Sequence, residues 1–142
     1  MVLSSLSKYS DFGLLVLRVV IGCMFVHYGT PLLFGGHEKW VQLGQSMGNF
    51  HIHFWPAFWG FMAAFSEFFG GICLILGLFF RPMCILLTIT MVVAAKLHFA
   101  KGEGLMVAAH AIEDGVVFFG LIFIGPGKYS LDAWLKSIFS LR

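Results

Sequence analysis

Four long apolar stretches divide the chain, and charged or turn-forming residues bound each of them. At 1.5 Å per residue, a helix of each length can cross the ~30 Å hydrocarbon core of a bilayer. The stretches show no alternation with a period of two, and they are too long for the strands of a membrane barrel. The pattern therefore predicts four transmembrane helices in one integral-membrane domain of residues 1–142. The predicted spans are residues 12–34, 57–80, 83–100 and 105–124.

The links between the stretches predict how the helices are arranged. The second and third links are short, so the helices that they join must be antiparallel neighbours. The predicted fold class is therefore all-α, an antiparallel four-transmembrane-helix bundle. The first link, residues 35–56, has room for an amphipathic helix from Glu38 to Met47 at the membrane surface. This interfacial loop could cover a ligand or serve only as an anchor, because the tryptophans that follow it are typical of membrane interfaces.

The tail, residues 125–142, has apolar residues at helical spacing, flanked by lysines and an arginine. This pattern predicts a short C-terminal amphipathic helix that lies on anionic lipid or on a partner protein. The apolar positions are Leu131, Trp134, Leu135, Ile138 and Phe139.

The composition supports a membrane protein and excludes several other classes. Of the 142 residues, 59% are hydrophobic and 11% are charged, whereas soluble domains have about 25% charged residues. Such an apolar excess cannot be buried in one small soluble core. The formal net charge of +2 offers no electrostatic footprint for binding nucleic acid. The three cysteines lie in apolar stretches without a Cys-x-x-Cys pair, so we interpret them as small apolar residues.

Lysine and arginine residues are divided unequally between the two ends of the predicted bundle. Five flank the end that carries both termini, and three flank the other end. By the positive-inside rule, both termini are expected in the cytoplasm. The first group is Lys8, Arg81, Lys128, Lys136 and Arg142, and the second is Lys39, Lys96 and Lys101.

Several ionisable residues fall inside the predicted spans, where such groups are costly and usually face the bundle interior. They are Arg18, His27, Glu67, His98, His110, Glu113 and Asp114. Arg18 shares a helix face with Gly22, Phe25 and Gly29, by their spacing of three and four. Glu67 lies within a face of glycines and alanines on the second span, which lets helices approach closely. We therefore expect Arg18 and Glu67 to form an ion pair that keeps Glu67 ionised.

Five of these groups are expected at one depth in the membrane. Counted from the predicted cytoplasmic ends of the helices, they lie within roughly one helical turn of each other and come from all four spans. They are His27, Glu67, His98, His110 and Glu113. His110 and Glu113 are also expected to share a helix face, because they are three residues apart.

Such a layer of polar groups has several chemical interpretations. Histidine and carboxylate could bind a transition metal, although the Glu-x-x-His order of di-iron bundles is absent. Two facing histidines could hold haem. The groups could also bind a quinone head group, with His or Glu handling the proton that accompanies electron transfer. Alternatively, they pair only with one another and fix the register of the helices.

Three segments of the chain carry sequence motifs. Residues 28–36 are similar to a His-Gly-x-Pro-Lys-Leu-x-Gly-Gly signature, with Tyr28 at the position of the His and Leu32 at that of the Lys. Residues 66–82 contain a Glu, a Gly-Gly pair, Leu-Gly-Leu and an Arg, and residues 125–132 follow the pattern Gly-Pro-Gly-x-x-Ser-Leu-Asp. In these three segments the chain resembles the DoxX-like family of small four-helix membrane proteins.

The resemblance implies a protein of the bacterial inner membrane. Arg18 lies at the position of the family's first-helix Arg. It also implies a subunit of a quinone-linked oxidoreductase, because some members belong to thiosulfate:quinone oxidoreductase or quinol oxidase systems. The alternatives are a non-catalytic anchor or assembly factor for a redox enzyme, and a small solute or proton conductor. A homo-oligomer that forms through a small-residue face is a further alternative. The candidate catalytic residues are Glu67, Glu113 and His110, and the candidate ligand-binding residues are Arg18, His27, Tyr28, His98 and Asp114.

Overall fold

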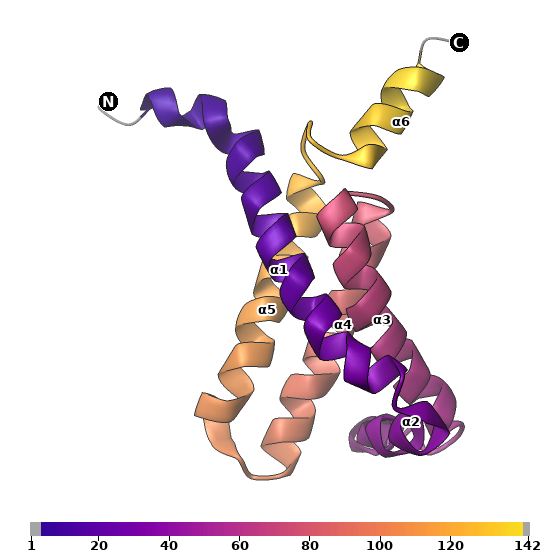
Figure 1. Ribbon diagram of the computed structural model, residues 1–142. Coiled ribbons are helices and arrows are strands. Elements are labelled where there is room, and N and C mark those ends of the chain that lie inside the picture. Colours follow the sequence, from indigo (N-terminus) through magenta and orange to yellow (C-terminus); the bar gives the residue numbers. More distant parts are fainter. Residues whose placement is uncertain (1–3, 141–142) are drawn as a thin grey trace.

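The computed structural model describes residues 4–140, with side chains from Leu6 onward. This part of the chain is helical and contains no strand. Four of its helices are long and apolar enough to cross a membrane, as the sequence predicts. They are α1 (Ser10–Leu33), α3 (Pro56–Leu76), α4 (Phe80–Ala100) and α5 (Gly104–Ile124), and a 3₁₀ helix, η1 (Ser4–Tyr9), leads into α1 (Figure 1).

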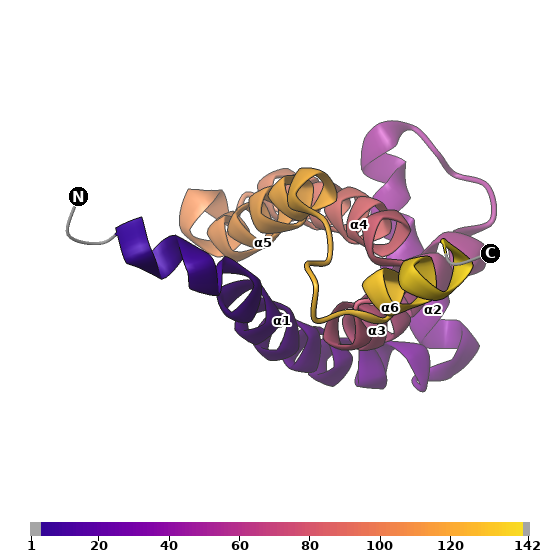
Figure 2. The same ribbon diagram turned by 90° about the horizontal axis from the view of Figure 1, so that it is seen from above.

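The four long helices form two packed pairs, α1 with α3 and α4 with α5, and contacts between α3 and α4 join the pairs. Seen from above in Figure 2, α4 and α5 lie on one side and α1 and α3 on the other. The ring of Phe25 on α1 reaches α5, where it packs edge-on against Phe118 with 4.8 Å between the ring centroids. Both termini and the α3–α4 turn lie at one end of the bundle, which we call the terminal end (Figure 1). The α1–α2 and α4–α5 turns lie at the opposite end, the loop end (Figure 1).

The buried face of α1 is the one that the sequence predicts. It consists of Arg18, Gly22, Phe25 and Gly29. A Cβ atom on Gly22 would lie 2.6 Å from Cγ1 of Ile75. A Cβ atom on Gly29 would lie 2.4 Å from the backbone nitrogen of Phe68. The two glycines therefore let the backbones of α1 and α3 approach closely, which is how helices associate in lipid.

The turn between α3 and α4 differs from the predicted spans. α3 ends at Leu76 rather than at Phe80, because Gly77 adopts a left-handed conformation (φ 64°) that caps the helix. Glycine is favoured at this position because it has no Cβ to oppose a positive φ. α4 then begins at Phe80 rather than at Met83.

The tail forms α6 (Leu131–Phe139), the amphipathic helix that the sequence predicts there. Ser130 caps it, because its hydroxyl accepts a backbone N–H from the first turn at 3.2 Å. The carboxylate of Asp132 accepts the backbone N–H groups of Phe79 and Phe80 at 3.0 and 2.9 Å. The first N–H groups of a helix have no partner within it. The tail therefore caps the start of α4.

The long first link forms α2 (Gly36–Gly44) and a 3₁₀ helix, η2 (Gln45–Phe50), in agreement with its amphipathic pattern. α2 packs against α3 at short range, since a Cβ on Gly60 would lie 1.7 Å from the carbonyl oxygen of Trp40. The indole N–H of Trp40 donates to the carbonyl of Leu32 at 3.1 Å. α2 is thus fixed to both α1 and α3 at the loop end.

Candidate functional site

Arg18 is buried near the terminal end of the bundle, with 1% of its surface exposed. Its Nε donates to the carbonyl of Leu74 at 3.1 Å. Its Nη2 donates to the carbonyls of Ile75 at 3.3 Å and Tyr129 at 2.9 Å, and Nη1 donates to the carbonyl of Pro126. One guanidinium therefore joins α1 to the last turn of α3 and to the segment between α5 and α6.

The predicted ion pair between Arg18 and Glu67 is wrong. Among residues 4–140 no ion pair joins these side chains, and the α3 carbonyls that Arg18 binds lie about two helical turns from Glu67. The physical reason is that the last carbonyls of a helix lack partners and carry its partial negative charge. Gly77 leaves room for the guanidinium, since a Cβ there would lie 3.1 Å from Cζ of Arg18.

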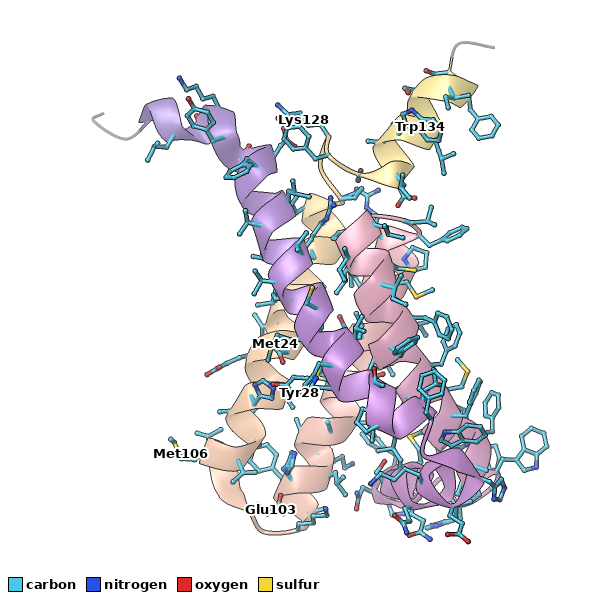
Figure 3. All side chains as sticks on the ribbon, viewed as in Figure 1. Met24, Tyr28, Glu103, Met106, Lys128 and Trp134 are labelled. Carbon is cyan, nitrogen blue, oxygen red and sulfur yellow. The ribbon has the colours of Figure 1, made fainter. Side chains whose placement is uncertain are left out.

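A cavity of about 320 Å³ lies inside the bundle, and all four long helices line it. We call it the polar cavity. It lies on the loop side of the contact between Phe25 and Phe118, and Arg18 does not line it. In Figure 3, Tyr28 on α1 lies near the middle of the bundle, and Glu103 lies in the turn at its lower end. The polar side chains of the cavity are Tyr28, Glu67, His98, His110 and Asp114.

His110 and Tyr28 lie at the rim of the polar cavity, between α5 and α1. Their rings are perpendicular, with 5.9 Å between the centroids. Nε2 of His110 lies 3.5 Å from Oδ2 of Asp114, one turn further along α5. The His110 side chain is 67% exposed and that of Asp114 is 19% exposed. The polar cavity is therefore open between α1 and α5, and the His110 imidazole lies at its mouth near a carboxylate.

His98 connects the polar cavity with the surface of the loop end. Its ring lines the cavity, and its Nδ1 forms a hydrogen bond with the carboxylate of Glu103 in the α4–α5 turn. This hydrogen bond lowers the pKa of Glu103. The sequence analysis missed Glu103, because the residue lies outside the predicted spans. The available signal was its position just beyond the end of a helix, five residues after a histidine.

Glu67 has no protein partner for its carboxylate. No hydrogen bond or ion pair to this group is formed by any residue from 6 to 140. The side chain lines the polar cavity and also a second cavity between α3 and α4. A carboxyl group without a partner is costly in the middle of a membrane, so Glu67 is the lining residue best suited to receive a hydrogen bond from, or give one to, a ligand.

His27 and Glu113 do not line the polar cavity, although the sequence places them in the same layer. Both are exposed, and each is next to a residue that does line it, Tyr28 and Asp114 respectively. Successive residues point about 100° apart around a helix, and in these two pairs Tyr28 and Asp114 are the ones turned toward the cavity. Tyr28, at the position of the family's signature His, is the one on the cavity.

The polar side chains are not arranged as a metal centre. Within the described part of the chain, no group of three or more His, Cys, Asp and Glu residues could hold a metal ion. His98 and His110, the two histidines of the polar cavity, each have a carboxylate neighbour instead. The three cysteines are unpaired thiols. The donor set therefore suits hydrogen bonding and proton exchange better than metal ligation.

Fold and site together define a small membrane protein in which four spanning helices surround a polar cavity. The DoxX family model matches residues 13–102, and the chain belongs to this family. The match covers α1 to α4, so it includes Tyr28, Glu67 and His98. Comparison with curated proteins and with solved structures found no match.

Proposed function

We propose that the chain is the quinone-binding membrane subunit of an oxidoreductase system. The polar cavity supports this proposal, because polar side chains from all four long helices face one volume of about 320 Å³. This volume falls within the usual range of small-molecule sites. The mouth between α1 and α5 lies on the side of the bundle, where a lipid-soluble molecule can enter from the bilayer.

The residues of the cavity fit a quinone head group. Its two carbonyl oxygens accept hydrogen bonds, and its reduction takes up two electrons and two protons. Tyr28 and His110 lie together at the mouth and can donate to a carbonyl oxygen. Phe25 and Met91 supply an apolar lining. Glu67 faces the same volume with a carboxyl group that has no partner within the described part of the chain.

The chain's own residues also provide a route for protons. Nε2 of His110 lies 3.5 Å from the Asp114 carboxylate at the mouth of the cavity, and an imidazole can exchange protons near neutral pH. Glu67 presents its carboxyl group to the polar cavity, where such a group can exchange a proton with a bound ligand. His98 lines the cavity and bonds to Glu103 at the loop-end surface. Protons therefore pass between water at the loop end and the polar cavity through His98.

The proposal includes a location and a partner. Lys8, Arg81, Lys128 and Lys136 flank the terminal end, so the positive-inside rule places both termini in the cytoplasm of a bacterial inner membrane. The polar cavity then opens in the outer half of the bilayer. The electrons come from a soluble or membrane redox enzyme subunit that associates with this chain.

Binding of a tail-less benzoquinone to the purified protein in lipid nanodiscs tests the proposal. Calorimetric titration of the wild type is expected to give saturable binding. Glu67→Leu and His110→Leu are each expected to raise the Kd about tenfold or more, since each removes a hydrogen-bonding group worth about 1.5 kcal/mol.

Glu113→Leu is the matched control, because Glu113 is also a span carboxylate but lies outside the polar cavity. It is expected to leave the Kd unchanged. Absence of binding to the wild type, or an equal loss in Glu113→Leu and Glu67→Leu, contradicts the proposal.

A membrane anchor or assembly factor for a redox enzyme is the second candidate, and α6 favours it. The helix projects from the terminal end (Figure 1), and Trp134 and Phe139 on it are exposed. Trp134→Ala combined with Phe139→Ala is expected to abolish copurification of a redox partner while quinone binding persists. Truncation after Gly127 is a poorer test, because it also removes Asp132 and the Tyr129 carbonyl that hold the bundle together.

A further inference from the structure

A second cavity, of about 270 Å³, lies between α3 and α4 in the loop half of the bundle. We call it the apolar cavity. Phe58, Trp59 and Met62 line it from α3, and Val93 and Leu97 line it from α4. Leu43 and Gly44 of α2 and Ser46 and Met47 of η2 line it at the loop end. Its walls are therefore mostly hydrocarbon and aromatic rings.

The hydroxyl groups on its walls already have partners. The hydroxyls of Ser66 and Thr90 share a hydrogen bond at 2.6 Å, and the Ser66 hydroxyl also lies 2.9 Å from the carbonyl of Ala63. Thr90 donates to the carbonyl of Leu86 at 2.9 Å, and Ser46 donates to that of Leu43 at 2.7 Å. An occupant therefore finds few free hydrogen-bonding groups there, and a hydrocarbon chain matches this lining.

The apolar cavity is preformed, because α2 and η2, which close it at the loop end, are held against both α3 and α4. The close approach of Gly60 to Trp40 fixes α2 to α3. The ammonium group of Lys96 on α4 lies 4.2 Å from the ring centroid of Phe50, at the end of η2. Cation–π contacts of this kind are favourable. α2 and η2 thus bridge α3 and α4 at the loop end, where the cavity lies between these helices.

The two cavities adjoin, because Glu67 and Ala94 line both of them. Ala94 has a short side chain, so little material separates the two volumes on the α4 side. We infer that the apolar cavity binds the isoprenoid tail of the quinone whose head group lies in the polar cavity, with Glu67 at the junction. This inference rests on the proposed function. It assigns the site a substrate class, a quinone with a long tail.

A photoreactive prenyl quinone that carries a diazirine near the end of its tail tests the inference. After irradiation of the protein in nanodiscs, mass spectrometry is expected to find the tail attached to residues of the apolar cavity, such as Met62 and Leu97. Val93→Phe fills this cavity and is expected to reduce that labelling at least fivefold. Val92→Phe is the matched control, because Val92 precedes Val93 in the chain but is exposed and does not line the cavity.

Binding of the tail-less benzoquinone separates the possible failures. If the wild type does not bind it, the proposed function fails and this inference fails with it. If the wild type and Val93→Phe both bind it, the variant is folded and the head-group site is intact. Tail labelling at lipid-facing residues such as Val92 and Phe119 then overturns the inference alone. A diazirine phospholipid that labels the apolar cavity, and that excess prenyl quinone does not displace, also overturns the inference.

Discussion

Arg18 near the terminal end of the bundle and Glu67 in its loop half differ in the partners of their polar groups. At the terminal end, Arg18 donates to four backbone carbonyls, and Asp132 accepts two backbone N–H groups. In the loop half, the carboxylate of Glu67 has no partner among the described residues, and His110 is open to the outside. Ionisable side chains of either kind, with or without partners, are costly in a membrane. The difference indicates that polar groups with hydrogen-bond partners hold this fold together, whereas a polar group without a partner is available to a ligand.

Replacing Arg18 is the largest test of this comparison. Arg18→Met is expected to lower the free energy of unfolding by about 3–5 kcal/mol, because it leaves several buried carbonyls without donors. Arg81→Met is the control, since the hydrogen bond that Arg81 donates to the Ile122 carbonyl, at 3.0 Å, is exposed. It is expected to cost about 1 kcal/mol. Denaturant titration in bicelles measures both, and equal costs would break the comparison.

Asp132→Ala tests the cap that the tail provides to α4. The loss of two accepted N–H groups is expected to cost about 1–2 kcal/mol, as for other helix caps. Hydrogen exchange should accelerate at the amides of Phe79 and Phe80, while binding of the tail-less benzoquinone stays unchanged. Ser137→Ala, an exposed change on the same helix, is the control. Unchanged protection of these two amides would show that the tail does not cap α4.

Glu67→Gln is expected to lower the free energy of unfolding by no more than about 0.5 kcal/mol, because no partner among the described residues is lost. Ser66, the residue before Glu67, is expected to have a larger effect on the free energy of unfolding. Ser66→Ala removes the hydrogen bonds to Ala63 and Thr90 and is expected to cost about 1 kcal/mol. Denaturant titration of both variants measures the difference. A larger loss in Glu67→Gln than in Ser66→Ala would place Glu67 among the groups that hold the fold.

The smallest expected effect is the pH dependence of the His98–Glu103 contact. The hydrogen bond with His98 lowers the pKa of Glu103 in the folded state. A carboxyl of this kind stabilises the fold above its unfolded pKa, about 4.3, and the contribution disappears as the pH falls through the lower folded value. The Tm of the wild type should therefore fall more below about pH 4 than that of Glu103→Gln.

The control for this experiment is Glu38→Gln, which changes an exposed carboxyl on α2. It is expected to keep the wild-type dependence of Tm on pH. Identical curves for the wild type and Glu103→Gln would show that the contact does not contribute to stability.

Part of the candidate site could be predicted from the sequence. Counting along the helices places Glu67, His98 and His110 at one depth, because the rise per residue is constant, and all three line the polar cavity. The choice between Glu113 and Asp114 could not be made in this way. Lipid is as apolar as the bundle interior, so apolar periodicity does not show which way a transmembrane helix is turned.

The sequence by itself determined the four spans, the buried face of α1, and the helices of the first link and the tail, because each depends on local spacing. Only the tertiary structure decided the partners of Arg18, which lie as far as 111 residues away along the chain. It likewise decided that Asp132 caps α4 and that Glu67 lies where two cavities meet. The physical reason is that unpaired backbone groups at helix ends attract any buried charge that can reach them. Which charge can reach them depends on how the helices pack.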